Sequence, residues 1–511
     1  MGIGILVSRI TGLARDIAVA AFLGTGLLAD AYYAAIKIPN IIRNLLGEGT
    51  LSAAFVPVYS ETLEKADRGS LESTRLASSV LGIVLATAVL LSALGVALAP
   101  WITRSLLLGA SLEATNVTTD LVRILFPMSG VLIVGAWCLG VLTSHGRFFL
   151  PFVAPTLWNA SQIAGLFVAQ ALGSERLAHA LAWSALAGSL LQVGVQLPAA
   201  RSLAGTIRPA LQWGWEPVRR VARNTLPVIS SQGIFQISSL VDISLAALVG
   251  TSAMSALGYS QRLIYLPISL FGMSVAAAAL PEMSREATAE RLRPRLVNGF
   301  FQILFFVLPT GVFLLLFGDL VVRVIYERRA FGETSTVLVA AVVAAYALGL
   351  VATSSLRLFS SGFHAMQDTR TPMRIAAISV TAGIAAAVGM TLAARAVLPS
   401  SYRPFAAVAI ALGGAAGAWL NLGLLWSALD RRIGPLFDRQ AVKAIIRLAI
   451  ASLAAAAAGI VARGWLSSRL PPAGFLSGLL LLLGIATAGA IPYLAIVRRA
   501  PVMIAEEGRD V

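Results

Sequence analysis

The sequence predicts an all-α polytopic membrane protein with about 14 transmembrane helices, arranged as two six-helix lobes related by a parallel repeat plus two extra C-terminal helices. Hydrophobic residues make up 58% of the 511 residues and charged residues only 12%, about half the charged share of a soluble chain. Apolar stretches long enough to cross a bilayer recur along the whole chain. A ten-residue motif recurs in the second half. Together these observations exclude an ordinary soluble enzyme.

The predicted membrane spans are continuous apolar runs, which excludes a closed β-barrel with alternating strands. The first run contains Arg9, Arg15 and Asp16, so it is not a cleavable signal peptide, whose apolar region is uncharged. Cys138 is the only cysteine, which excludes an intrachain disulfide. The spans are 2–23, 27–60, 77–107, 121–144, 148–172, 177–200, 221–249, 253–283, 298–325, 336–364, 373–394, 404–429, 441–463 and 474–497.

The distribution of cations predicts the orientation. The net charge is +15, which in a soluble protein would suggest nucleic acid, but here the location of the charges matters more and no nucleic-acid partner is expected. Loops after even-numbered spans, with the C-terminal tail, hold 23 Lys and Arg residues, whereas loops after odd-numbered spans hold 10. Because cytoplasmic loops are enriched in Lys and Arg, both termini are predicted to be cytoplasmic.

An internal repeat predicts the lobe arrangement. Residues 16–25 (DIAVAAFLGT) and 242–251 (DISLAALVGT) match at six of ten positions without a gap. Six predicted spans separate the copies, so both enter the membrane from the same side. Parallel lobes of this kind usually rock about a central substrate site, which indicates a transporter with alternating access. We assign 1–200 to the N-lobe, 201–220 to a cytoplasmic linker, 221–430 to the C-lobe, and 431–511 to the last two spans and a cytoplasmic tail.

Ionisable residues lie inside several predicted spans, where an Arg or Lys exposed to lipid costs roughly 2.5–3.5 kcal/mol. They must therefore face a hydrated cavity or pair with acids. A spacing of seven residues places Asp16 on the helix face of Arg9, and Lys37 on the face of Asp30. The set comprises Arg9, Arg15, Asp16, Asp30, Lys37, Arg43, Glu48, Asp242, Arg262 and Arg357.

The surplus of cations in this set predicts a cavity that binds an anion. Because the planar guanidinium suits phosphate oxygens, Arg9, Arg15, Arg43 and Arg262 are the predicted phosphate ligands. The alternative, that these charges form internal ion pairs that lock helices together, stays open. No catalytic residue is predicted, and the three histidines lack metal-ligand spacing, so no metal site is predicted. The supporting cavity charges are Asp16, Asp30, Lys37, Glu48, Asp242 and Arg357.

Two further features concern lipid. The last two spans are the least polar part of the chain, which favours either simple helix packing through small residues or a groove for a long lipid tail. A basic run in one predicted cytoplasmic loop is interpreted as a topology signal that contacts anionic lipid. That run consists of Arg285, Arg291, Arg293 and Arg295.

The same residues carry a resemblance to a known family. The segments SRITGLARD (8–16), ADAYYAAIKIPNIIRNLLGEGTLSAAFVPVYSE (29–61), GYSQRLIYLPISLFGMSVAAAALPEMSR (258–285) and QDTRTP (367–372) resemble the MurJ/MviN family of lipid II flippases, in the MOP exporter superfamily with its MATE-like fold. The resemblance implies that the lipid-linked peptidoglycan precursor moves from the inner to the outer leaflet of the bacterial cytoplasmic (inner) membrane. It also implies that the four arginines hold the pyrophosphate, and that the last two spans hold the polyprenyl tail.

The resemblance further implies lipid II, membrane lipids and cell-wall synthesis complexes as partners. No cofactor is expected, and transport in the family is linked to membrane potential or, in some members, to a sodium ion. Span 11 offers no Asp or Asn to join Asp242, which argues against such a sodium site here. The chain begins almost inside its first span, whereas the family usually has several more residues there, so we expect a natural start upstream of Met1.

Other functions were weighed against the flippase. A flippase for another undecaprenyl-pyrophosphate-linked oligosaccharide would present the same anionic anchor, so it stays open. A drug exporter needs a cavity that accepts cations, which the arginine surplus disfavours. A membrane-embedded cell-wall enzyme would need a nucleophile–base constellation, and none stands out. A non-transporting scaffold is disfavoured because all four arginines are present.

Overall fold

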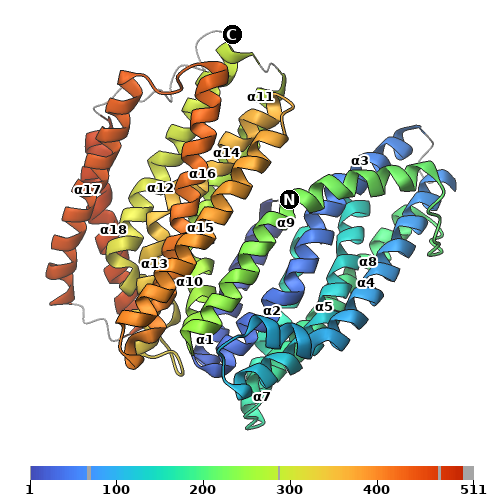
Figure 1. Cartoon of the computed structure of the whole chain (residues 1–511), viewed down its shortest axis with the longest axis horizontal. Helices are drawn as coiled ribbons and strands as arrows, with labels where there is room; N and C mark the ends of the chain where they lie inside the picture. Colours follow the sequence, from blue (N-terminus) through green and yellow to red (C-terminus); the bar gives the residue numbers. More distant parts are fainter. Residues whose placement is uncertain (1, 66–70, 286–287, 470–473, 499–511) are drawn as a thin grey trace. The chain divides into compact units, whose positions relative to one another are not determined.

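The computed structural model describes residues 2–65, 71–285, 288–469 and 474–498, and every regular element within these ranges is a helix (Figure 1). The all-α prediction is therefore confirmed. By contact, the chain divides into two compact units. Unit 1 comprises Met1–Ser255 with Arg328–Phe331, and unit 2 comprises Ala256–Glu327 with Gly332–Val511.

Unit 1 is built around a long helix that is apolar on nearly all sides, α5. Its helices are α1 (Gly2–Leu23), α2 (Leu27–Leu46), α3 (Glu48–Lys65), α4 (Leu71–Leu106), α5 (Leu112–Ser144), α6 (Phe149–Val153), α7 (Pro155–Ala171), α8 (Leu177–Ala204) and α9 (Glu216–Val249). Helix α5 packs against α2, α3, α4 and α8. Its Trp137 is fully buried and donates a hydrogen bond from the indole nitrogen to the carbonyl of Ala77 at 3.1 Å.

Unit 2 contains the remaining helices, and the first of them, α10, begins three residues inside unit 1. Helix α12 is its central element and packs against α13, α14, α17 and α18. The elements are α10 (Ala253–Pro267), the π-helical turn η1 (Ile268–Gly272), α11 (Met273–Arg285), α12 (Ala289–Tyr326), α13 (Glu333–Leu348), α14 (Leu350–Ala365), α15 (Arg370–Val397), the 3₁₀ turn η2 (Ser400–Ala406), α16 (Ala407–Ile433), α17 (Arg439–Ser467) and α18 (Phe475–Arg498).

The last two helices attach to α12 through apolar and charged contacts. Phe317 and Leu320 of α12 pack with Leu481 of α18 in a small buried cluster. Both terminal nitrogens of Arg463 in α17 contact the carboxylate of Asp319 in α12, at 3.0 and 2.5 Å. The two extra helices of the predicted fold are therefore packed parts of unit 2.

Helices cover all fourteen predicted spans, as one helix or as consecutive helices. Within the described ranges, ten are long and apolar enough to cross a membrane, and eleven if α13 and α14, bent by 42°, form one span. Helices α1 and α2 fall short because each carries three charged residues. The exact count of fourteen crossings therefore stays a prediction.

The boundary between units differs in place from the predicted linker. Helix α8 continues to Ala204, and α9, which starts at Glu216, packs on α2, α3 and α4 within unit 1. The contact division thus falls after α9 rather than before it. The assignment of 1–200 and 221–430 to two lobes, with 431–511 as a separate part, stays a prediction.

The repeated motif has a clear local meaning. Helix α1 ends at Leu23 and α9 at Val249, each one residue before the repeated glycine. Gly24 and Gly250 have positive φ angles, +59° and +120°, which glycine adopts without the steric cost of a side chain. Both amides donate to the carbonyl four residues earlier. The two copies therefore share one device for ending a helix.

Candidate functional site

The charges of α1 meet α7 at Arg15, a buried arginine with several partners. Arg15 and Asp16 are each 6% exposed. The Nε and Nη2 atoms of Arg15 donate to one carboxylate oxygen of Asp16 at 3.1 and 2.6 Å, and Nη1 donates to Asn159 at 3.2 Å. These bonds use three of the five guanidinium N–H groups. The predicted face shared by Arg9 and Asp16 is thus not the one used, because Asp16 pairs with its neighbour Arg15.

Asn159 and Trp158 of α7 belong to this site, although the sequence analysis did not select them. The amide nitrogen of Asn159 donates to the carbonyl of Ser8 at 3.2 Å and to the hydroxyl of Thr11 at 3.1 Å. The Arg15 guanidinium lies 4.9 Å from the Trp158 ring centroid, within the range of a cation–π contact. An asparagine inside an apolar span was the available signal, since a polar group in lipid needs a partner.

Asp30 of α2 caps the start of α10. Its two carboxylate oxygens accept hydrogen bonds from the amides of Ser252 and Ser255 at 2.6 and 2.7 Å, and from the Ser255 hydroxyl at 2.6 Å. The first amides of a helix lack partners inside the helix and attract negative charge. The predicted common face of Asp30 and Lys37 therefore does not make a pair, because the carboxylate is engaged by this turn.

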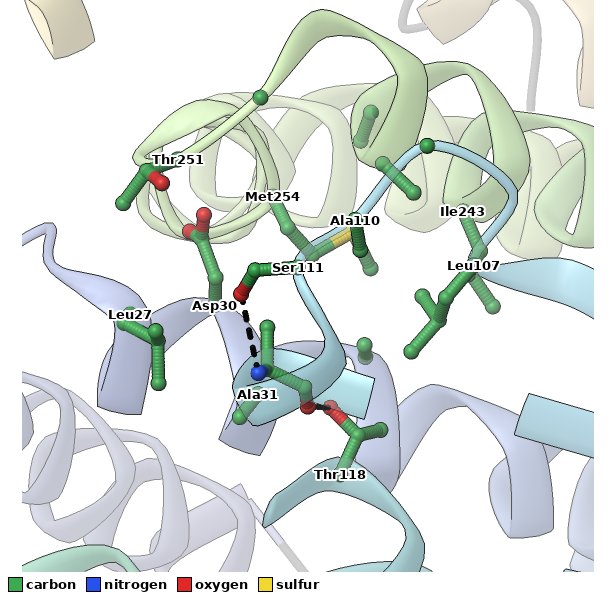
Figure 2. A pocket seen from close by; sticks show the side chains of 16 residues that line it. Leu27, Asp30, Ala31, Leu107, Ala110, Ser111, Thr118, Ile243, Thr251 and Met254 are labelled. Atoms are coloured by element: carbon green, nitrogen blue, oxygen red, sulfur yellow. Dashed lines mark hydrogen bonds between the residues drawn. The ribbon is translucent and has the colours of Figure 1, made fainter. Parts of the chain in front are cut away.

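A small cavity of about 120 Å³ lies beside Asp30 in unit 1. It is bounded by α2, by the turn between α4 and α5, by α9, and by the turn that leads into α10. In Figure 2 the Asp30 carboxylate points toward the turn that carries Thr251, while Ser111 lies across the cavity from it. Ser111 accepts a hydrogen bond from the amide of Ala114 as the N-cap of α5. Most other lining residues are apolar, so the cavity suits few polar contacts.

The remaining predicted residues of unit 1 lie on α1, α2, α3 and α9. Arg9 is exposed on α1, and Arg43 is half-buried in the last turn of α2. Lys37 is half-buried and close enough to Asp242 of α9 for the two charges to attract one another. Glu48 is the first residue of α3, and its side chain lies outside the described part of the chain.

Arg262 and Arg357, the predicted cations of the second half, lie in unit 2 on α10 and α14. Both are exposed. Next to Arg262, the Gln261 side-chain amide donates to the Tyr346 hydroxyl of α13 at 3.0 Å. The structure therefore brings Arg15, Asp16 and Asn159 together, and Lys37 with Asp242. A single chamber that joins Arg9, Arg15 and Arg43 with Arg262 stays a prediction.

The cytoplasmic motif QDTRTP, which carried part of the resemblance, forms a helix start. Asp368 accepts hydrogen bonds from the amides of Arg370 and Thr371 at 2.9 and 3.0 Å, and from the Thr371 hydroxyl at 2.6 Å. Arg432 of α16 lies 2.7 Å from the same carboxylate. These donors lower the pKa of Asp368 below its ordinary value. The motif therefore fixes the start of α15 against the end of α16.

Comparison with known proteins places this helical arrangement among transporters. The family model described as lipid II flippase MurJ matches residues 19–483. A protein of Rhizobium meliloti (strain 1021), named probable lipid II flippase MurJ, is 33% identical over 96% of this chain and 90% of its own length. A protein of the same name from Rhizobium tropici is 31% identical over 83% of this chain and 79% of its own length.

Solved structures share the fold. A structure titled lipid II flippase MurJ, inward closed conformation, superposes with a TM-score of 0.79 at 23% identity and covers 98% of both chains. An inward-facing multidrug resistance MATE family transporter of the MOP superfamily superposes with a TM-score of 0.67 at 15% identity, over 83% of this chain and 96% of that one. At these identities the likeness concerns the fold, and it supports the predicted superfamily.

Proposed function

The chain belongs to the lipid II flippase MurJ family, and we propose that it carries lipid II from the inner to the outer leaflet by alternating access. The observation that carries this proposal is the family match across residues 19–483, together with ten or more apolar helices that make the chain a multi-pass membrane protein. A flippase must move a charged headgroup through an apolar medium, so it needs polar groups inside the membrane. Helices α1 and α2 supply them.

We propose that Arg9, Arg15, Arg43 and Arg262 bind the pyrophosphate of the substrate. Arg15 already donates to Asp16 and Asn159, and its two other N–H groups can donate to phosphate oxygens. Asn159 fixes the orientation of the guanidinium, and orientation in advance reduces the entropy lost on binding. Asp16 keeps the buried cation neutralised when no substrate is bound.

The exposed faces of α17 and α18 support a site for the polyprenyl tail. Leu453, Val461, Leu483 and Ile491 are between 55% and 73% exposed. Smooth apolar surface on adjacent helices fits a long hydrocarbon chain through dispersion contacts. We propose that the tail stays on this surface while the headgroup passes through the protein.

The proposed location is the bacterial inner membrane, with both termini in the cytoplasm. The excess of Lys and Arg in loops after even-numbered spans supports this orientation. The proposed energy source is the membrane potential or a monovalent cation gradient, with no bound cofactor. Proposed partners are lipid II, membrane lipids and cell-wall synthesis complexes, which would consume the substrate after translocation.

The proposal is tested by complementation of a strain depleted of its own flippase. Arg15→Ala would leave Asp16 buried without its cation, which costs about 3–5 kcal/mol, so Arg15→Lys and Arg262→Ala accompany it. Exposed Arg176, at the start of α8, provides the matched control Arg176→Ala. We expect Arg262→Ala and Arg15→Lys to insert normally and fail to complement, while Arg176→Ala complements. Full growth with both Arg262→Ala and Arg15→Lys would contradict the binding site.

A further inference from the structure

The turn between α12 and α13 rests on the end of α1. The amide of Ala330 donates a hydrogen bond to the carbonyl of Ala21 at 3.0 Å. The Arg329 guanidinium lies 4.9 Å from the centroid of the Phe22 ring, and Phe331 is only 1% exposed. Residues 328–331 belong to unit 1 by contact, although the chain on both sides of them belongs to unit 2.

Gly24 makes this close approach feasible. A Cβ atom at Gly24 would lie 2.4 Å from the carbonyl oxygen of Ala330, and φ at Gly24 is +59°. The repeated glycine at the end of α9 differs, since a Cβ at Gly250 would meet nothing within 4 Å. The two copies of the motif end their helices in the same way, but only the first is covered by another segment. The cover is therefore a separate feature and not a by-product of the helix end.

The base of the turn is braced inside unit 2. Arg323 of α12 contacts Glu327 at 3.3 Å and Glu333 of α13 at 3.7 Å. The hydroxyl of Thr336 donates to the carboxylate of Glu327 at 2.6 Å. These bonds tie the two ends of the turn to α12 and α13. A stiffly mounted turn follows the helices that carry it, so residues 328–331 cannot stay on α1 if those helices move away.

We propose that residues 328–331 are a latch that holds the end of α1 and is released once in each transport cycle. The proposal rests on the proposed function, because alternating access requires the two halves of a transporter to rearrange. The turn between α12 and α13 and the end of α1 both fall on the predicted outer side. The latch uses one main-chain hydrogen bond, one cation–π contact and one buried phenylalanine, which is a small set that can break and re-form.

The latch itself is tested by hydrogen exchange on the full-length protein in detergent, without substrate. Gly24→Ala places a Cβ against Ala330, whereas Gly173→Ala introduces a Cβ at nearly the same backbone angle, φ +64°, with nothing within 4 Å. We expect the Ala330 amide to be protected in the wild type and in Gly173→Ala, and to exchange at least about tenfold faster in Gly24→Ala. Equal protection in both variants, or no protection in the wild type, overturns the latch.

Its role in transport is tested by locking it. Ala21→Cys with Ala330→Cys, in a Cys138→Ala background, places two thiols where the main-chain hydrogen bond keeps the residues adjacent. We expect oxidation to crosslink them and to stop lipid II transfer across reconstituted vesicles, and reductant to restore it. Transfer that continues at full rate in crosslinked protein overturns the latch. If unmodified protein transfers no lipid II, the proposed function fails, while the exchange result still decides whether the latch exists.

Discussion

A methyl group added at Gly413 tests the close contact of α15 and α16 in unit 2. A Cβ there would lie 2.5 Å from the Ala387 Cβ and 2.6 Å from its Cα. Because carbon atoms pack best at about 3.5–4.0 Å, the two helices must separate by about 1 Å. Overpacking of this kind costs about 1–3 kcal/mol. The contact is backbone against backbone, so no side chain can rotate away to relieve it.

The neighbouring Gly414 is the control for this prediction. It lies on the exposed side of α16, and a Cβ there would meet nothing within 4 Å. Both substitutions bring the same gain of about 1 kcal/mol in helix propensity, which cancels when the two variants are compared. We expect Gly413→Ala to be less stable than Gly414→Ala by about 1–3 kcal/mol, measured by SDS titration with circular dichroism. Equal stability of the two variants would refute the packing argument.

Three further predictions concern polar contacts. Asp30→Asn should weaken the cap of α10 by about 1–3 kcal/mol and lower the temperature at which buried Cys138 reacts with a thiol dye; an unchanged temperature would contradict the cap. Asp368, whose pKa is lowered by hydrogen bonds to its carboxylate, should stabilise the fold above its ordinary pKa of 3.8 and lose that contribution as pH falls through the folded-state value. In Asp368→Asn the difference in unfolding free energy between pH 6 and pH 3.5, chosen as about neutral and about ordinary carboxyl pKa, should shrink. Arg463→Met should loosen α17 from α12 by removing the contact with Asp319, seen as faster proteolysis between α16 and α17, whereas unchanged proteolysis would argue against the contact.

The helical fold could be predicted from the sequence because hydropathy is a local property. A run of twenty apolar residues needs a helix whatever surrounds it, since every backbone group in lipid must be bonded within the segment. The ends of α1 and α9 were also marked locally, by Gly24 and Gly250. The count of crossings could not be fixed in the same way, because α1 and α2 carry charges that reduce the very signal used to find them.

The partners of the charged residues could not be predicted from spacing. Helical periodicity shows which residues share a face, but it does not show what the face meets. Asp30 bonds to Ser252 and Ser255, more than 220 residues away, and Arg15 bonds to Asn159, 144 residues away. Such contacts depend on how helices pack. The sequence therefore identified ionisable residues that need partners, while the structure supplied the partners.

The most direct test of the account is the leaflet in which lipid II resides when this protein is depleted from living cells. Accessibility of lipid II to an externally added enzyme or probe measures its outer-leaflet share. We expect that share to fall on depletion, to recover with the wild type and with Arg176→Ala, and not to recover with Arg262→Ala. An outer-leaflet share that is unchanged on depletion, in cells with no second flippase, would contradict the central claim.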